Sequence, residues 1–137
     1  MLAYTQTRRI EWGDCDPAGI VFNPRYFAFF DHGAAMLFET AGWPKPMLLQ
    51  TFQIVGIPLV ETQARFLAPC AFGDDVIITT AVSEIRRSSL DISHRLLKGD
   101  QLCVEGRETR VWAGRDPAGR MKSAPIPAEV VSRLTSD

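Results

Sequence analysis

The chain has few cysteines, no long apolar run and almost no excess of one charge. Its 137 residues include three cysteines, an odd number with no CxxC pair, which excludes a disulfide framework and a cysteine-rich zinc site. The 15 Lys+Arg residues nearly balance the 16 Asp+Glu residues, so binding of nucleic acid through its phosphates is not expected. No stretch approaches the ~20 apolar residues that span a bilayer, and residues 1–9 lack the apolar core of a signal peptide. We therefore expect a soluble, cytoplasmic protein with no membrane insertion.

The composition is that of a folded chain. Hydrophobic residues make up 46% of the sequence and charged residues 23%, a balance that argues against disorder. No internal repeat or low-complexity segment is visible. A chain of this length buries most of its unfolded surface without disulfides or metals. We expect a single domain over residues 1–137.

One helix is clearly indicated after residue 22. Asn23 suits the N-cap, Pro24 the first turn and Gly42 the C-terminal end. Between them apolar residues recur at the spacing of one helical face, namely Tyr26, Phe29, Phe30, Gly33, Ala34, Leu37 and Ala41.

The rest of the chain favours strands. β-branched runs and period-two alternation predict strands near 5–12, 59–67, 76–82, 90–96 and 102–113, with a short helix near 127–134. The order of one strand, a long helix and four strands in hairpin succession predicts an α+β fold whose five-stranded antiparallel sheet wraps around one long central helix. A single helix leaves sheet edges uncovered, which favours a homo-oligomer, a dimer or a tetramer.

The most informative segment is the turn-rich loop before the helix. It contains Asp16 within Asp14-Cys15-Asp16-Pro17-Ala18-Gly19, a few residues before Asn23. The first amides of a helix are unpaired and partly positive, so they polarise a carbonyl oxygen held there. A carboxylate facing that carbonyl carbon attacks it or activates a water molecule. The same residues are also ordinary turn formers, and spacing alone leaves that alternative open.

A resemblance to a known enzyme family begins in this loop. The matching residues are Gly13-Asp14-Cys15-Asp16-Pro17-Ala18-Gly19-Ile20-Val21, then Pro24, Tyr26 and Asp31, with Val55-Gly56, Pro58, Asp74-Asp75-Val76 and Arg86-Arg87 further along. They make the chain similar to the hotdog-fold acyl-CoA thioesterases over nearly its whole length. Within that family it resembles the 4-hydroxybenzoyl-CoA thioesterases of the Pseudomonas type.

The resemblance implies a site at the interface of a dimer. Asp16 is then the catalytic nucleophile or general base, and the backbone amide of Asn23 polarises the thioester carbonyl. Asp31 lies near the acyl pocket, and Arg86 and Arg87 hold the phosphates of coenzyme A. Adjacent guanidinium groups suit a multiply charged phosphate ligand, although a basic strand end on a solvated face is the simpler alternative. Coenzyme A is part of the substrate, and no cofactor or metal is implied.

The chain departs from the 4-hydroxybenzoyl-CoA pattern at a few positions. It has Phe22-Asn23 where the family has a tyrosine after an aromatic residue, Pro46 near an expected tryptophan, and Ser88 in place of a lysine. These differences concern the acyl group and the grip on coenzyme A. They leave thioester hydrolysis as the expected reaction. The alternatives are an aliphatic acyl-CoA hydrolase, a non-catalytic acyl-CoA-binding module, and a hotdog dehydratase, whose chemistry needs a histidine that the Asp16 loop lacks.

Other polar residues have structural interpretations. Asp14 and Asp16 lack the further ligands of an oxygen-lined metal site, so Asp14 is expected to hydrogen-bond within its own loop. His32 follows Asp31 on the helix and points about 100° away from it, because residues i and i+1 do not face each other. His94 alternates with apolar residues and is expected in the core or an interface.

Overall fold

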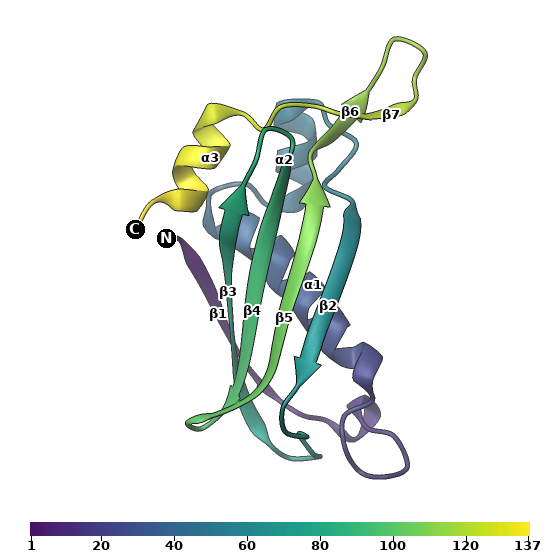
Figure 1. Cartoon of the computed structure of the whole chain (residues 1–137), viewed down its shortest axis with the longest axis vertical. Helices are drawn as coiled ribbons and strands as arrows, with labels where there is room; N and C mark the ends of the chain where they lie inside the picture. The colour runs from purple at the N-terminus through teal and green to yellow at the C-terminus, as the bar shows by residue number, and fades with distance from the viewer.

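The computed structural model describes all 137 residues and confirms the α+β fold, with a five-stranded antiparallel sheet packed on the long helix α1 (Figure 1). The elements in chain order are β1 (Ala3–Arg9), the 3-10 turn η1 (Trp12–Asp14), α1 (Asn23–Thr40), α2 (Lys45–Phe52), β2 (Leu59–Phe66), β3 (Asp75–Ile85), β4 (Ser89–Lys98), β5 (Gln101–Val111), β6 (Ala113–Arg115), β7 (Met121–Ser123) and α3 (Ala128–Thr135). No helix is long and apolar enough to cross a membrane.

The order of the strands corrects the prediction of four strands in hairpin succession. The sheet runs β1-β3-β4-β5-β2, so β4 and β5 separate β2 from β3. β1 occupies the free edge of β3, with Ala3 opposite Ala81, and β2 therefore pairs with the far side of β5. The hairpin between β4 and β5 is as expected, with Lys98 opposite Gln101. As a result, β2 is an edge strand of the sheet.

Helix α1 begins one residue away from the predicted cap. Phe22, in extended conformation, is the N-cap, and Asn23 is already helical, so the prediction of Asn23 as the cap is wrong. The N–H of Arg25 bonds to the Phe22 carbonyl at 2.8 Å and closes the first turn. Pro24 lies in that turn as expected, and Gly42 follows the helix with φ of +114°, a backbone conformation that favours glycine.

The core is divided along α1 into two apolar clusters. The first packs the C-terminal half of α1 against α2, α3 and one end of the sheet, and includes Leu37 and Trp112. The second packs the N-terminal half of α1 against the other end, and includes Tyr26 and Phe30. Between them lies a polar belt, defined as the buried side chains of Gln6, Thr80, His94 and Glu108.

Helix α1 crosses this polar belt at Gly33. A Cβ atom at that position would lie 2.6 Å from Oγ1 of Thr80. Glycine therefore lets the helix approach the sheet closely at the belt, and the amide of Gln6 bonds to the Phe29 carbonyl at 3.2 Å nearby. These contacts set the position of α1 along the sheet.

Two parts of the fold were not expected. Helix α2 forms in a segment for which the sequence analysis predicted no element, and Pro46 lies in its first turn, where proline is tolerated. The long last strand ends at Val111, and the chain continues into the β6–β7 hairpin. Strand β1 ends at Arg9, short of the predicted boundary, and η1 follows it.

Candidate active site

A small hairpin at the N-terminus of α1 forms the first part of the site. Cys15 and Val21 pair in an isolated bridge, and the N–H of Asp16 bonds to the Ile20 carbonyl at 3.0 Å. Gly19 has φ of +82° at the turn, where glycine carries no Cβ penalty. The second arm of the hairpin leads directly into α1, so Asp16 is held beside the beginning of the helix.

Asp14 anchors this hairpin to the protein. Its carboxylate, almost fully buried, accepts hydrogen bonds from the N–H of Glu11 at 2.9 Å and from the Arg25 guanidinium at 3.1 Å. The carbonyl of Asp14 also accepts the N–H of Phe22 at 2.9 Å. Asp14 therefore stabilises the loop, as expected, and both its carboxylate oxygens are occupied.

Asp16 and Asn23 carry the free polar groups at this end. One carboxylate oxygen of the half-buried Asp16 accepts the N–H of Ala18 at 2.8 Å, and the other has no hydrogen-bond donor in the chain. The N–H of Asn23 makes no backbone hydrogen bond, as expected in the first turn of a helix. A free carboxylate oxygen and a free helix N-terminal amide are thus present at the same end of α1.

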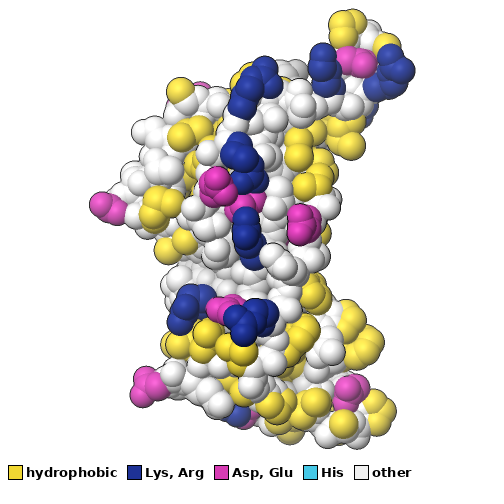
Figure 2. Space-filling view, in the orientation of Figure 1, with side chains coloured by type: hydrophobic (Ala, Val, Ile, Leu, Met, Phe, Trp, Pro, Cys, Tyr) yellow, Lys and Arg dark blue, Asp and Glu magenta, His cyan; other side chains and the backbone are white.

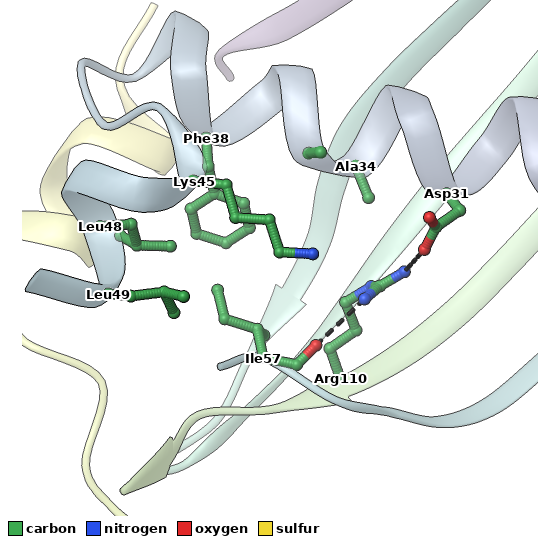
Figure 3. Close-up of a pocket in the computed structure, with 9 residues that line it drawn as sticks. Asp31, Ala34, Phe38, Lys45, Leu48, Leu49, Ile57 and Arg110 are labelled. Carbon is green, nitrogen blue, oxygen red and sulfur yellow. Dashed lines mark hydrogen bonds and ion pairs between the residues drawn. The ribbon is translucent and has the colours of Figure 1, made fainter. Parts of the chain in front are cut away.

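Asp31 lines an apolar pocket further along α1 (Figure 3). The pocket lies between α1, α2 and the segment before β2, and its walls are Ala34, Ala35, Phe38, Leu48, Leu49 and Ile57, with Lys45 and Arg110 as the other polar members. Asn23, Phe27 and Asp31 follow one another at four-residue spacing on one face of α1, which connects the hairpin to the pocket. At 1.5 Å per residue, Asp31 lies about 12 Å along the axis from Asn23.

Arg110 on β5 holds Asp31 in place. Its guanidinium lies 2.6 Å from Asp31, 2.6 Å from Glu108 and 3.0 Å from the carbonyl of Ile57. Burial by itself would lower the pKa of Arg110, but the hydrogen bonds to Glu108 and Asp31 outweigh it and raise the pKa. Arg110 is therefore a permanent cation, and Asp31 keeps one oxygen free.

Glu108 connects Arg110 to the polar belt. Oε2 of the buried Glu108 lies 3.2 Å from Nε2 of His94, and Nδ1 of His94 is 2.7 Å from the Thr80 hydroxyl. The His94 ring stacks on Phe30 with centroids 4.7 Å apart. His94 is therefore a core histidine, as expected, while His32 is exposed on α1.

Arg86 and Arg87 lie in the turn between β3 and β4 but have different surroundings. Arg86 forms two hydrogen bonds to the buried carboxylate of Asp91, at 2.7 and 3.3 Å, and an ion pair with Glu84 at 2.9 Å. Arg87 is exposed and makes no ion pair. Figure 2 shows Lys and Arg side chains running down this outer face of the sheet. Only Arg87 of the pair has a fully free guanidinium.

Asp91 is the centre of this outer cluster. It accepts hydrogen bonds from Arg86, from Arg107 at 2.6 Å and from Thr109 at 2.7 Å. The hydrogen bonds from Arg86 dominate and, despite burial, hold the pKa of Asp91 far below its usual range. The cluster was not identified from the sequence, because it depends on the register that places Asp91 of β4 directly opposite Thr109 of β5.

Arg110, Glu108 and Lys45 were also missed. Glu108 and Arg110 are two residues apart on β5 and therefore point to the same face of the sheet, a spacing that is visible in the sequence. Their relation to Asp31 depends on how α1 packs across β5, and no local pattern shows that.

Metal and thiol chemistry have no counterpart in this region. No group of three or more His, Cys, Asp or Glu side chains is placed to hold a metal ion. The Cys15 thiol donates a hydrogen bond to the Glu11 carbonyl at 3.6 Å. Cys70 is buried, and burial raises the pKa of its thiol to about 11.

Comparison with known proteins identifies the family. Residues 10–134 match the thioesterase-like superfamily. The chain belongs to this superfamily.

Individual relatives match this chain over nearly its full length. The chain is 35% identical over 134 residues to a 4-hydroxybenzoyl-CoA thioesterase of Pseudomonas sp. (strain CBS-3), covering 93% of this chain and 94% of that protein. It superposes with a TM-score of 0.88 and 31% identity on a crystal structure of an Asp-to-Asn mutant of 4-hydroxybenzoyl-CoA thioesterase complexed with 4-hydroxybenzoyl-CoA, covering 98% and 100%. A gentisyl-coenzyme A thioesterase structure matches with a TM-score of 0.81 and 32% identity, covering 97% and 100%. The hotdog fold predicted by resemblance is confirmed.

Proposed function

We propose that this member of the superfamily is an acyl-CoA thioesterase that hydrolyses a CoA thioester with an aromatic acyl group, using Asp16 as its catalytic carboxylate. The observation that carries the proposal is the free oxygen of Asp16 in the hairpin that leads into α1, where the Asn23 amide is also free. The curated and solved relatives that act on 4-hydroxybenzoyl-CoA and gentisyl-CoA support the aromatic substrate class.

The proposed chemistry requires only these groups and water. The Asn23 N–H donates a hydrogen bond to the thioester carbonyl oxygen and stabilises the negative charge that develops there. The Asp16 carboxylate attacks the carbonyl carbon, the C–S bond breaks, and the thiolate of coenzyme A leaves; water then hydrolyses the mixed anhydride. Alternatively, Asp16 takes a proton from a water molecule that attacks the same carbon. Either route yields the free acid and coenzyme A.

Two observations support a dimer as the active form. All residues of the edge strand β2 except Ala64 are exposed, including the apolar Leu59, Val60 and Phe66. An open, partly apolar strand edge invites pairing with a second copy. The second observation is that Arg87 follows the end of β3 while the Asp16 hairpin pairs with residues before its start, on the order of 30 Å away for an 11-residue strand.

A partner packed antiparallel through β2 would bring its own Arg86 and Arg87 toward this Asp16 hairpin. The nucleotide and the thioester of one substrate would then contact different protomers. Three statements stay predictions: the chain forms a dimer or a tetramer, it is located in the cytoplasm, and it needs no cofactor, since coenzyme A is part of the substrate.

The dehydratase alternative receives no support from the site. The chain has two histidines, one exposed on α1 and one bonded within the polar belt, and neither belongs to the Asp16 hairpin. A non-catalytic acyl-CoA-binding module differs from an enzyme only in turnover, and the experiment below separates the two.

The decisive experiment measures thioester hydrolysis by the Asp16→Asn variant. Purified protein is assayed against aromatic and aliphatic CoA thioesters, with Asp100→Asn, an exposed turn substitution, as the matched control. We expect a preference for aromatic acyl groups and a fall in kcat of about 10²-fold or more in Asp16→Asn, with a much smaller change in KM, because a catalytic group is lost while binding remains.

The opposite outcomes are equally clear. Wild-type turnover in Asp16→Asn would contradict the assignment of the catalytic carboxylate. Broad activity on aliphatic thioesters would indicate the aliphatic acyl-CoA hydrolase instead. Binding of thioesters without turnover by the wild type would indicate the binding module.

A further inference from the structure

The Asp16 hairpin is held by residues 70 and 71, which lie between β2 and β3 at the end of the sheet where α1 begins (Figure 1). The N–H of Val21, on the second arm of the hairpin, donates to the Cys70 carbonyl at 2.9 Å. Next to it, Ile20 and Ala71 form an isolated bridge. Because the second arm also pairs with the arm that carries Asp16, the position of this carboxylate depends on what holds residues 70 and 71.

Tyr26 of α1 holds this segment. Tyr26 is 3% exposed, and its hydroxyl oxygen accepts the N–H of Cys70 at 3.3 Å. Burial raises the pKa of Tyr26, so the hydroxyl stays neutral. Its ring packs against Phe29 and Phe66, with centroids 6.3 and 5.7 Å apart, and these contacts restrict where the hydroxyl lies. The backbone of Cys70 therefore bonds to α1 through its N–H and to the hairpin through its carbonyl.

The same helix carries the free amide of Asn23. Tyr26 follows Asn23 by three residues, about 4.5 Å along the helix axis. The Tyr26 hydroxyl thus relates the hairpin that contains Asp16 to the helix end that contains the Asn23 amide. Both groups must reach one thioester carbonyl from fixed positions, and a small misplacement of reacting groups lowers the rate strongly.

From these contacts we propose that Tyr26 is a positioning residue, whose hydroxyl acts through the backbone of Cys70 to fix the Asp16 carboxylate relative to the Asn23 amide. The inference rests on the proposed function, since it takes Asp16 and Asn23 as the reacting pair. The hydrogen bonds between Arg25 and Asp14 anchor the start of the hairpin independently. Removal of the Tyr26 hydroxyl therefore displaces the hairpin without unfolding it.

The test compares two substitutions that each remove one hydroxyl group. Tyr26→Phe removes the bond to Cys70, and Tyr4→Phe is the matched control, because Tyr4 is the other tyrosine of the chain and its hydroxyl makes no hydrogen bond within it. We expect Tyr26→Phe to lower kcat about fivefold or more on a CoA thioester that the wild type hydrolyses, with KM changing less than about twofold, because alignment is lost while binding remains. Tyr4→Phe should leave both constants unchanged.

Amide hydrogen exchange supplies a second measurement that needs no substrate. The Val21 amide should exchange about fivefold or more faster in Tyr26→Phe than in the wild type, because the segment that it bonds to is loosened. The amides of the central strand β4 should keep their wild-type rates, since the rest of the fold is unaffected.

An unchanged kcat in Tyr26→Phe, an equal loss in Tyr4→Phe, or a rise in KM alone would overturn the positioning role while leaving Asp16 as the catalytic carboxylate. A lower kcat with wild-type exchange at Val21 would overturn it as well, because the hairpin would not have moved. Absence of hydrolysis by the wild type would instead overturn the proposed function. In that case the exchange measurement decides whether Tyr26 holds the hairpin: faster exchange at Val21 supports it, and an unchanged rate refutes it.

Discussion

Replacing Arg110 by methionine tests the organisation of the pocket through stability. Its guanidinium pairs with two carboxylates at the same 2.6 Å distance, but their surroundings differ. Glu108 is 3% exposed and Asp31 is 69% exposed, while Arg110 itself is 12% exposed. Removing one member of a buried pair costs about 3–5 kcal/mol, because the remaining charge stays buried without its permanent counter-ion. Losing a pair with an exposed member costs roughly 0–1 kcal/mol.

We therefore expect Arg110→Met to lower the free energy of unfolding by about 3–5 kcal/mol and Asp31→Asn by less than about 1 kcal/mol. Adding Glu108→Gln to Arg110→Met should recover more than half of the loss, since it removes the stranded charge. The measurement is urea unfolding followed by circular dichroism at one fixed protein concentration, because oligomer stability depends on concentration. Equal losses in the two single variants, or no recovery in the double variant, would refute the reasoning.

Two further predictions concern the outer face of the sheet. Because Arg86 holds the pKa of Asp91 far below its usual range, this carboxylate stabilises the fold above about pH 4 and loses that contribution as the pH falls further. The free energy of unfolding, measured in urea, should therefore fall more steeply in acid for the wild type than for Asp91→Asn. The same pH dependence in both proteins would contradict this prediction. Arg87→Ala should raise KM for CoA thioesters and spare short thioesters without the nucleotide, since its guanidinium is free for phosphate; equal losses on both substrate types in steady-state kinetics would exclude a phosphate contact.

Local sequence patterns were sufficient to predict a helix or strand whose formation depends on its own residues. The spacing of Tyr26, Phe29 and Leu37 predicted α1, and the alternation around Ile92 predicted β4, because each element buries one face. The predicted order of the strands was wrong because the edge at which β2 pairs depends on β1 already pairing with β3. No local sequence pattern shows that pairing.

The candidate site divides in the same way. Asp16 and Asn23 are seven residues apart, with Asp16 in the hairpin and Asn23 in the first turn of α1, so their proximity follows from a short stretch of sequence. The environment of Asp31 depends on Arg110, 79 positions away, and that of Arg86 on a carboxylate across a hairpin. Residue types and spacing pointed to Asp16 and Asn23. The resemblance to the thioesterases suggested roles for Asp31, Arg86 and Arg87, but it did not show the ion-pair partners of Asp31 and Arg86.

The division of the core by the polar belt has a consequence for how such enzymes diverge. The Asp16 hairpin rests on the cluster around Tyr26, whereas the apolar pocket beside Asp31 is built from the cluster around Leu37 and from α2. Substitutions in separate, non-contacting regions act nearly independently. Under the proposed function, substitutions around α2 are therefore expected to change the acyl preference while the Asp16 hairpin keeps its structure.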